Sequence, residues 1–182
     1  MKRFFFLIGT SFVSLLLSAQ TFSDKNGTAY FISKTDVINI DATNKTVASI
    51  IKKESGEIVA IALIKAFKFS LATAFDHFNE EYMESSKYPK ASYKGKILEL
   101  PELDLTKEGT YNVTTEGELT IHGVTKPIKE KGVITIKDGK MTGECNFSVL
   151  LDDYKIEVPA MVKDRVAQNI EIKLSATYDL TK

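Results

Sequence analysis

Cysteine, histidine and tryptophan are scarce in this sequence. It has one cysteine, Cys145, two histidines and no tryptophan. A single cysteine excludes an internal disulfide, so the stability of the fold has to come from its hydrophobic core. Cys145 alternates with Phe147 and Val149, which is typical of a small buried side chain. No neighbouring base indicates a reactive thiol.

Common catalytic and metal-binding motifs are also missing from the sequence. It contains neither Gly-x-Ser-x-Gly nor His-Glu-x-x-His, and two histidines leave a zinc site short of ligands. His122 ends a predicted strand on its outward face, where a ring that bonds to nearby backbone is the ordinary role. His77 lies in a predicted helix as a lid or surface residue. We predict no catalytic residue and no metal site; an enzyme that uses His122 is an open alternative.

No block of one charge sign occurs either. Lysine and arginine together number 24, as do aspartate and glutamate. Without the first 19 residues the chain keeps 22 basic and 24 acidic residues, a net charge of −2. A nearly neutral chain with no basic patch does not indicate nucleic-acid binding or electrostatic attraction to anionic lipids.

The N-terminus carries the only long hydrophobic run. Lys2 and Arg3 precede apolar residues from Phe4 to Leu17, and the small Ser18 and Ala19 follow. The run has 14 residues, shorter than the roughly 20 that span a bilayer. This layout predicts a signal peptide over residues 1–19 and one exported domain over 20–182. We expect a periplasmic or secreted protein with no integral membrane segment after cleavage.

Most of the chain after Glu57 alternates between apolar and polar residues. One such face holds Val113, Leu119 and Ile121, a second holds Phe147 and Val149, and a third runs from Ile170 to Tyr178. This period predicts strands with one buried face. Turn signals lie at 107–109, 122–127, 137–140 and 151–154. Short strands joined by short turns favour an antiparallel sandwich or barrel.

Two segments before this region are less regular. The sequences TAYFIS and KTVASIIKKE predict two or three further strands. The stretch from Ile58 to Ile64 is apolar at every position, which predicts a strand covered on both faces, such as one that a helix crosses.

The period changes to that of a helix over about 71–85. Leu71, Ala74, Phe75, Phe78 and Tyr82 recur at spacings of three and four. The helix must end before the proline at position 89. The pair of Thr73 and Asp76 resembles a capping box, and the glutamates at 80, 81 and 84 are expected on the solvated face.

Seven aromatic residues gather between positions 67 and 93. They fit either an ordinary core or the wall and lid of a ligand cavity. An eight-stranded barrel has the size at which the interior is either filled by side chains or holds one small ligand. The pattern leaves both interpretations open.

Three segments resemble the YceI-like family of exported bacterial proteins that bind polyisoprenoid lipids. They are HFNEEYMESSKYPKASYKGKI from His77, GELTIHGVTKPI from Gly117, and the stretch from Phe147 to Leu180. The resemblance implies a mainly β fold: an extended, antiparallel, eight-stranded, lipocalin-like barrel with a short helix against it. It also implies a long apolar ligand, such as a polyprenyl lipid or the tail of a quinone, inside the barrel.

The sequence thus predicts an exported, non-enzymatic lipid-binding protein without a cofactor. A structural or stress-related barrel with a filled core is the main alternative, and a homodimer is left open. The candidate ligand-binding residues are Phe67, Phe69, Phe75, Phe78, Tyr82, Tyr88, Tyr93, Ile97, Leu119, Ile121, Phe147 and Val149.

Overall fold

Eight long antiparallel strands close into a barrel in the computed structural model, which describes residues 20–181. They are β1 (Thr21–Lys34), β2 (Asn39–Lys52), β3 (Glu57–Leu63), β5 (Lys90–Ile97), β6 (Gly109–Ile121), β7 (Val124–Lys137), β8 (Lys140–Leu150) and β9 (Asn169–Asp179). The order around the barrel is β1, β9, β8, β7, β6, β5, β3 and β2, and β2 pairs back with β1. The predicted fold is confirmed. The predicted signal peptide lies outside the described residues.

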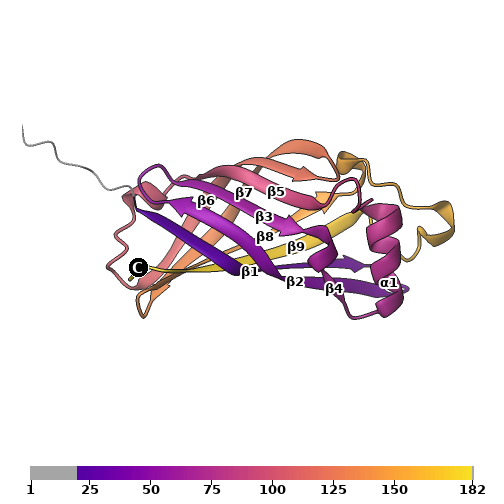
Figure 1. Cartoon of the computed structure of the whole chain (residues 1–182), viewed down its shortest axis with the longest axis horizontal. Helices are drawn as coiled ribbons and strands as arrows, with labels where there is room; N and C mark the ends of the chain where they lie inside the picture. The colour runs from indigo at the N-terminus through magenta and orange to yellow at the C-terminus, as the bar shows by residue number, and fades with distance from the viewer. Residues whose placement is uncertain (1–19, 182) are drawn as a thin grey trace, which may run out of the picture.

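The two ends of the barrel differ in what covers them. The helix α1 (Ala72–His77), the two-residue strand β4 (Lys68–Phe69) and the connection from β8 to β9 gather at one end, and the chain ends at the other (Figure 1). Two 3-10 turns, Asp152–Tyr154 and Ala160–Val162, lie within that connection. We call the end with α1 the mouth and the opposite end the closed end.

The alternating residues face the interior as predicted. Val113, Leu119, Phe147, Val149 and Ile170 are all buried, and neighbouring strands pair in register, for example Phe147 with Ile172. Burying one face of each strand therefore fixes which side of every strand forms the core.

The prediction that β3 is covered on both faces was wrong. Val59 and Leu63 are 41% and 54% exposed. They lie on the outer face of the barrel, because α1 packs at the mouth and not across the wall. The apolar composition of this segment is thus no sign of a second covering layer.

The predicted helix is real but shorter and less regular. The α-helix covers Ala72–His77, and a π-helical turn over Phe78–Tyr82 continues it. The capping-box prediction was wrong, since Leu71 is the extended residue before the helix and Thr73 lies inside it. The buried Asn79 donates from Nδ2 to the carbonyl oxygen of Phe75 at 2.9 Å, which ties the two turns together.

The hairpin turn between β6 and β7 is also shorter than predicted. Only His122 and Gly123 form it, both with positive φ, as a tight two-residue hairpin turn requires. Pro127 is therefore part of β7. In the described structure β7 pairs with β8 only over Gly132–Lys137, so Pro127 lies where one edge of its strand is free and its missing N–H breaks no ladder.

Candidate functional site

Two adjacent cavities occupy the barrel interior. The deeper one has a volume of about 130 Å³, and the one nearer the mouth about 160 Å³. Six residues line both: Val47, Ala60, Tyr93, Leu119, Phe147 and Leu174. Apart from the tyrosine hydroxyl these side chains are hydrocarbon, so the two cavities are separated only by apolar side chains.

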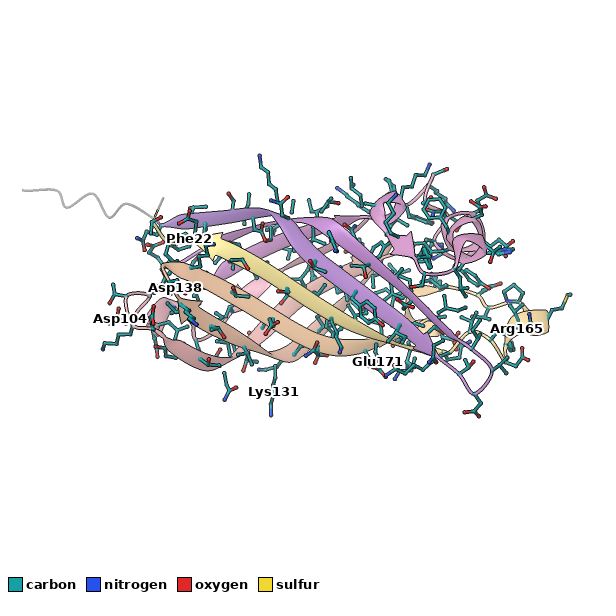
Figure 2. All side chains as sticks on the ribbon, turned by 90° about the horizontal axis from the view of Figure 1, so that it is seen from below. Phe22, Asp104, Lys131, Asp138, Arg165 and Glu171 are labelled. Atoms are coloured by element: carbon teal, nitrogen blue, oxygen red, sulfur yellow. The ribbon has the colours of Figure 1, made fainter. Side chains whose placement is uncertain are left out.

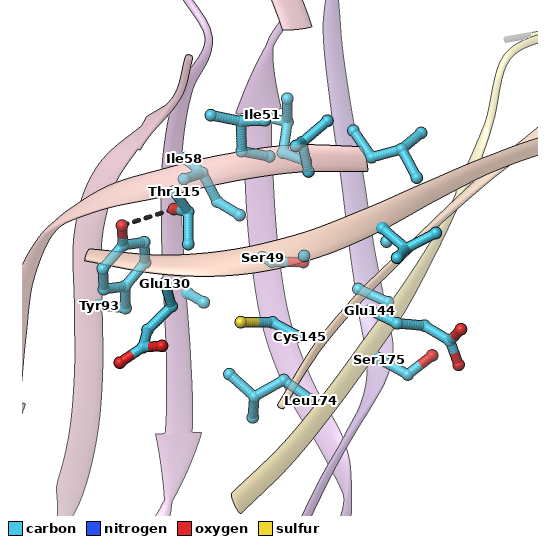
Figure 3. A pocket seen from close by; sticks show the side chains of 18 of the residues that line it. Ser49, Ile51, Ile58, Tyr93, Thr115, Glu130, Glu144, Cys145, Leu174 and Ser175 are labelled. Carbon is cyan, nitrogen blue, oxygen red and sulfur yellow. Dashed lines mark hydrogen bonds between the residues drawn. The ribbon is translucent and has the colours of Figure 1, made fainter. Parts of the chain in front are cut away.

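A few polar groups reach the deeper cavity (Figure 3). The hydroxyls of Tyr93 and Thr115 form a hydrogen bond of 2.6 Å, and Cys145 and Glu130 also line the wall. Burial raises the pKa of the Cys145 thiol to about 11, with a smaller contribution from Glu130. This thiol is therefore neutral near pH 7, which agrees with the inert cysteine that the sequence predicts.

A glycine pair brings β5 and β6 close together beside Tyr93. Gly95 and Gly117 are directly opposite each other. A Cβ on Gly117 would clash with the backbone of Gly95, and one on Gly95 would clash with the Tyr93 ring. The two glycines thus leave room for Tyr93 to lie along the wall with its hydroxyl on Thr115.

An aromatic cluster surrounds the upper cavity. Phe31 from β1 stacks on Phe78 with ring centroids 5.4 Å apart, and Phe67 lies 5.4 Å from Phe31. Phe69 from β4 lies 5.0 Å from Phe78. The π-helical turn, β1 and β4 therefore meet through their aromatic rings at the top of the cavity.

The mouth is a third, wider cavity of about 600 Å³. It shares Phe78, Met83, Leu151, Ile156 and Ile170 with the upper cavity. These shared residues are apolar, so apolar side chains line the boundary between the mouth and the upper cavity.

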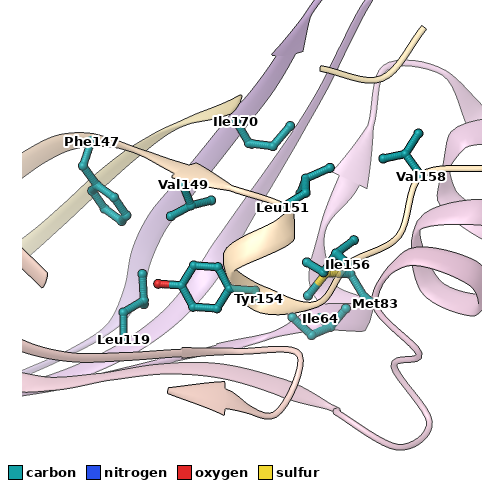
Figure 4. Close-up of a cluster of buried hydrophobic side chains, with 10 residues drawn as sticks. All are labelled: Ile64, Met83, Leu119, Phe147, Val149, Leu151, Tyr154, Ile156, Val158 and Ile170. Carbon is teal, nitrogen blue, oxygen red and sulfur yellow. The ribbon is translucent and has the colours of Figure 1, made fainter. Parts of the chain in front are cut away.

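A gap in the barrel wall is filled by the turn after β8. Residues 124–131 of β7 and the end of β8 lie beyond the β7–β8 pairing of the described structure. Tyr154, from the 3-10 turn Asp152–Tyr154, is 3% exposed and packs in the same cluster as Leu119 and Ile156 (Figure 4). Its side chain takes the place that a continued strand ladder would occupy.

His122 holds this turn and the end of the helical segment together. Its Nδ1 lies 3.1 Å from the carbonyl oxygen of Tyr154, and its Nε2 lies 2.8 Å from Oε2 of Glu84. A carbonyl oxygen only accepts, so Nδ1 carries the hydrogen of the first bond. The ring of Tyr88 packs edge-on against the imidazole at 4.6 Å.

The bond from His122 to backbone was predicted, but its outward position was wrong. The side chain is only 11% exposed, because its positive φ breaks the strand alternation and the segments around Glu84 and Tyr154 cover it. Glu84 was expected to be simply solvated and instead binds this ring. His77 is at the surface, where it pairs with Glu81 at 2.9 Å.

Most of the candidate ligand-binding residues come together in these cavities. Tyr93, Ile97, Leu119 and Phe147 line the deeper cavity; Phe67, Phe78, Ile121 and Val149 line the upper one; Phe69 and Tyr82 line the mouth. Two candidates are not among the described lining residues. Tyr88 packs on His122, and Phe75 packs on Phe69 with centroids 6.4 Å apart.

Several wall residues were missed by the sequence analysis. Phe31 could have been found, since it lies in a predicted strand two residues from the buried Ala29. Met83 and Ile156 follow no period, and only the folding of their loops against the mouth brings them to the cavity. Residues supplied by irregular segments leave no periodic signal.

The described residues contain no group of His, Cys, Asp and Glu that could hold a metal ion. None of the described helices is long and apolar enough to cross a membrane. The chemistry available at the cavities is therefore that of an apolar wall with isolated hydroxyl, thiol and carboxyl groups.

Solved structures share this fold. A polyisoprenoid-binding domain from Saccharophagus degradans aligns with 88% of this chain and 98% of its own, with a TM-score of 0.73 at 11% identity. BcnA from Burkholderia cenocepacia aligns with 83% of this chain and 95% of its own, with a TM-score of 0.69 at 13% identity. The YceI protein of Campylobacter jejuni aligns over 97% of each chain, with a TM-score of 0.52 at 17% identity.

At these identities the structural likeness shows the fold alone. A search of curated proteins found no match. The model of the YceI-like domain matches residues 18–178, which is nearly the whole chain. Together with the closed eight-stranded barrel, this match shows that the chain belongs to the YceI-like family.

Proposed function

We propose that this protein is exported with residues 1–19 as its signal peptide and that the barrel holds a long apolar lipid, such as a polyisoprenoid or a quinone tail. In this proposal it acts in the periplasm or outside the cell and catalyses no reaction. The observation that carries the proposal is the row of three neighbouring cavities from the mouth into the barrel, each sharing apolar lining residues with the next.

The size and chemistry of these cavities support an apolar ligand. The three cavities together fall within the range of about 300–1,000 Å³ that is common for ligand sites. Burying one five-carbon isoprene unit contributes on the order of 4 kcal/mol. A few units thus suffice for tight binding without any charged contact, although the costs of association prevent a simple sum.

The fold of a polyisoprenoid-binding domain from another bacterium supports the same ligand class by analogy. The scarcity of polar groups in the wall supports a role without catalysis. His122 has both ring nitrogens engaged by Tyr154 and Glu84, and His77, which lines the mouth, pairs with Glu81.

Native mass spectrometry of protein purified without detergent from its own host tests the proposal. We expect a chain that begins at Gln20 and carries a hydrophobic ligand, which organic solvent releases chemically unchanged. Protein that carries no ligand, and whose melting temperature does not rise when a polyprenyl lipid is added, would favour a filled or ligand-free barrel instead.

A further inference from the structure

Exposed apolar side chains lie around the mouth of the barrel. Val37, in the β1–β2 turn, is 59% exposed, and Met161, in the β8–β9 connection, is 92% exposed. Leu71, just before α1, is also exposed. Three segments far apart in the sequence thus present apolar side chains to solvent at one end of the molecule.

These side chains adjoin the row of cavities instead of forming an isolated patch. Leu71 and Met161 line the mouth cavity together with Ile38, and that cavity shares Phe78 and Met83 with the upper cavity of the barrel. An apolar ligand that enters by the mouth meets the exposed apolar groups first.

Two cationic residues follow Met161 closely in the sequence. Lys163 and Arg165 are exposed, and neither side chain forms an ion pair within residues 20–181. Arg165 is the only arginine after the predicted leader and lines the mouth. Its planar guanidinium suits phosphate oxygens. Asp164 lies between the two cations and Asp36 precedes Val37. The electrostatic attraction to phosphates is therefore confined to single side chains and is not that of a broad basic surface.

The opposite end has a different surface. Asp104 and Asp138 mark its loops, while Arg165 lies at the far end of the molecule (Figure 2). The residues that hold these loops are polar: Asp104 bonds to Thr106, and the backbone N–H of Asp138 donates to Glu108. The closed end also has an exposed leucine, Leu98, and exposed lysines at 137 and 140, so the mouth differs in that its exposed apolar side chains adjoin the mouth cavity.

We propose that the mouth docks onto a phospholipid bilayer, with Val37, Leu71 and Met161 in the interfacial layer and Arg165 against the phosphates. This inference rests on the proposed function and adds the surface from which the ligand enters. An apolar tail avoids water if the mouth meets the bilayer directly, and apolar tips beside cations are suited to that interface.

Co-sedimentation of the chain from Gln20 onward with vesicles tests the docking. The vesicles contain phosphatidylcholine alone or with added phosphatidylglycerol. We expect the pair Val37→Glu and Met161→Glu to weaken binding to both by about tenfold or more. Arg165→Gln should weaken binding to the anionic vesicles by about fivefold and reduce its salt dependence.

The pair Ile50→Glu and Leu98→Glu is the matched control. Both side chains are exposed and apolar, at 51% and 40%, but they lie on the wall and at the closed end. Their substitution should leave vesicle binding unchanged. A wild-type protein that does not sediment with vesicles, or equal losses in the two pairs, would overturn the docking surface.

Ligand retention measured in vesicle-free solution separates this inference from the proposed function. A tip variant that retains a preloaded polyprenyl lipid but no longer sediments with vesicles supports both. A wild-type protein that retains the lipid but does not sediment with vesicles overturns the docking proposal alone. Binding to vesicles without any lipid retention supports the docking and counts against the proposed function.

Discussion

The closed end and the mouth use the same alternation of side chains to different effect. At the closed end Ile134, Met141 and Tyr178 are almost fully buried and pack against one another. At the mouth Phe31, Phe69 and Phe78 are only partly buried, and each lines the upper cavity or the mouth. This difference shows that the alternation of apolar and polar residues determines which side chains face inward. It does not determine whether those side chains fill the space between the walls.

The source of the difference is what plugs each end. The connection between β5 and β6 places Leu100, with no exposed surface, inside the closed end, and Ser49 and Tyr178 share a hydrogen bond of 2.7 Å there. The mouth is covered by a short helix and a long connection, whose side chains line the opening without filling it. The closed end is therefore the more tightly packed of the two, and the mouth is the more open.

The largest effect is expected from Ile134→Ala at the closed end. Ile134 is 2% exposed and packs in the closed-end cluster beside the deeper cavity, so its truncation removes many contacts and we expect a loss of about 2–5 kcal/mol in the free energy of unfolding. Ile128→Ala is the matched control, because it lies on the same strand and also borders the deeper cavity but is only partly buried. Chemical denaturation of both variants measures the difference, and equal losses would abolish the contrast between the two ends.

Alkaline pH should destabilise the closed end next. Burial raises the pKa of Tyr178 from 10.0 to about 12. The folded state therefore holds this proton more tightly than the unfolded state, so the stabilisation is complete below pH 10 and is lost as the pH rises through 12. We expect a loss of about 2 kcal/mol over that range. Denaturation at several pH values measures it, and Tyr178→Phe should flatten the curve by that amount.

Phe78→Ala should cost less than Ile134→Ala in the ligand-free protein. Phe78 borders the upper cavity and the mouth, so some of its surface lacks packing partners already. We expect a loss of about 1–2 kcal/mol in the free energy of unfolding. This is well below the loss of roughly 3–5 kcal/mol that follows truncation of a phenylalanine in a filled core. The rise in melting temperature on adding a polyprenyl lipid should shrink as well. Phe75→Ala serves as a control, and identical ligand-linked rises in both variants and wild type would remove Phe78 from the site.

The smallest global effect is expected from His122→Ala. This change removes the hydrogen bonds to Tyr154 and Glu84, which we expect to lower stability by about 1 kcal/mol. Amide exchange should speed up around residues 152–156 and 84–88, while the closed end stays protected. His77→Ala removes only an exposed surface pair and should change neither quantity. Uniform loss of protection along the whole barrel would contradict a role for His122 confined to the mouth.

The sequence by itself determined the strands and most of their inward-facing residues, and its resemblance to a family implied the barrel. Alternation identified Leu119, Phe147 and Val149 as inward-facing, because a strand with one buried face admits only one register. The change of period located the helical segment, and three characteristic segments indicated the family whose domain matches residues 18–178. These features are local or repeat at a fixed interval, so the order of residues is enough to reveal them.

Only the tertiary structure decided what the interior contains and how the mouth is held. Whether inward-facing side chains meet or leave a cavity depends on distances across the barrel. Strand periodicity carries no information about those distances. The tie from His122 to Glu84 and Tyr154 joins residues 38 and 32 positions apart. The gathering of Val37, Leu71 and Met161 at one end likewise arises because strand closure brings distant turns together, and no local pattern records that closure.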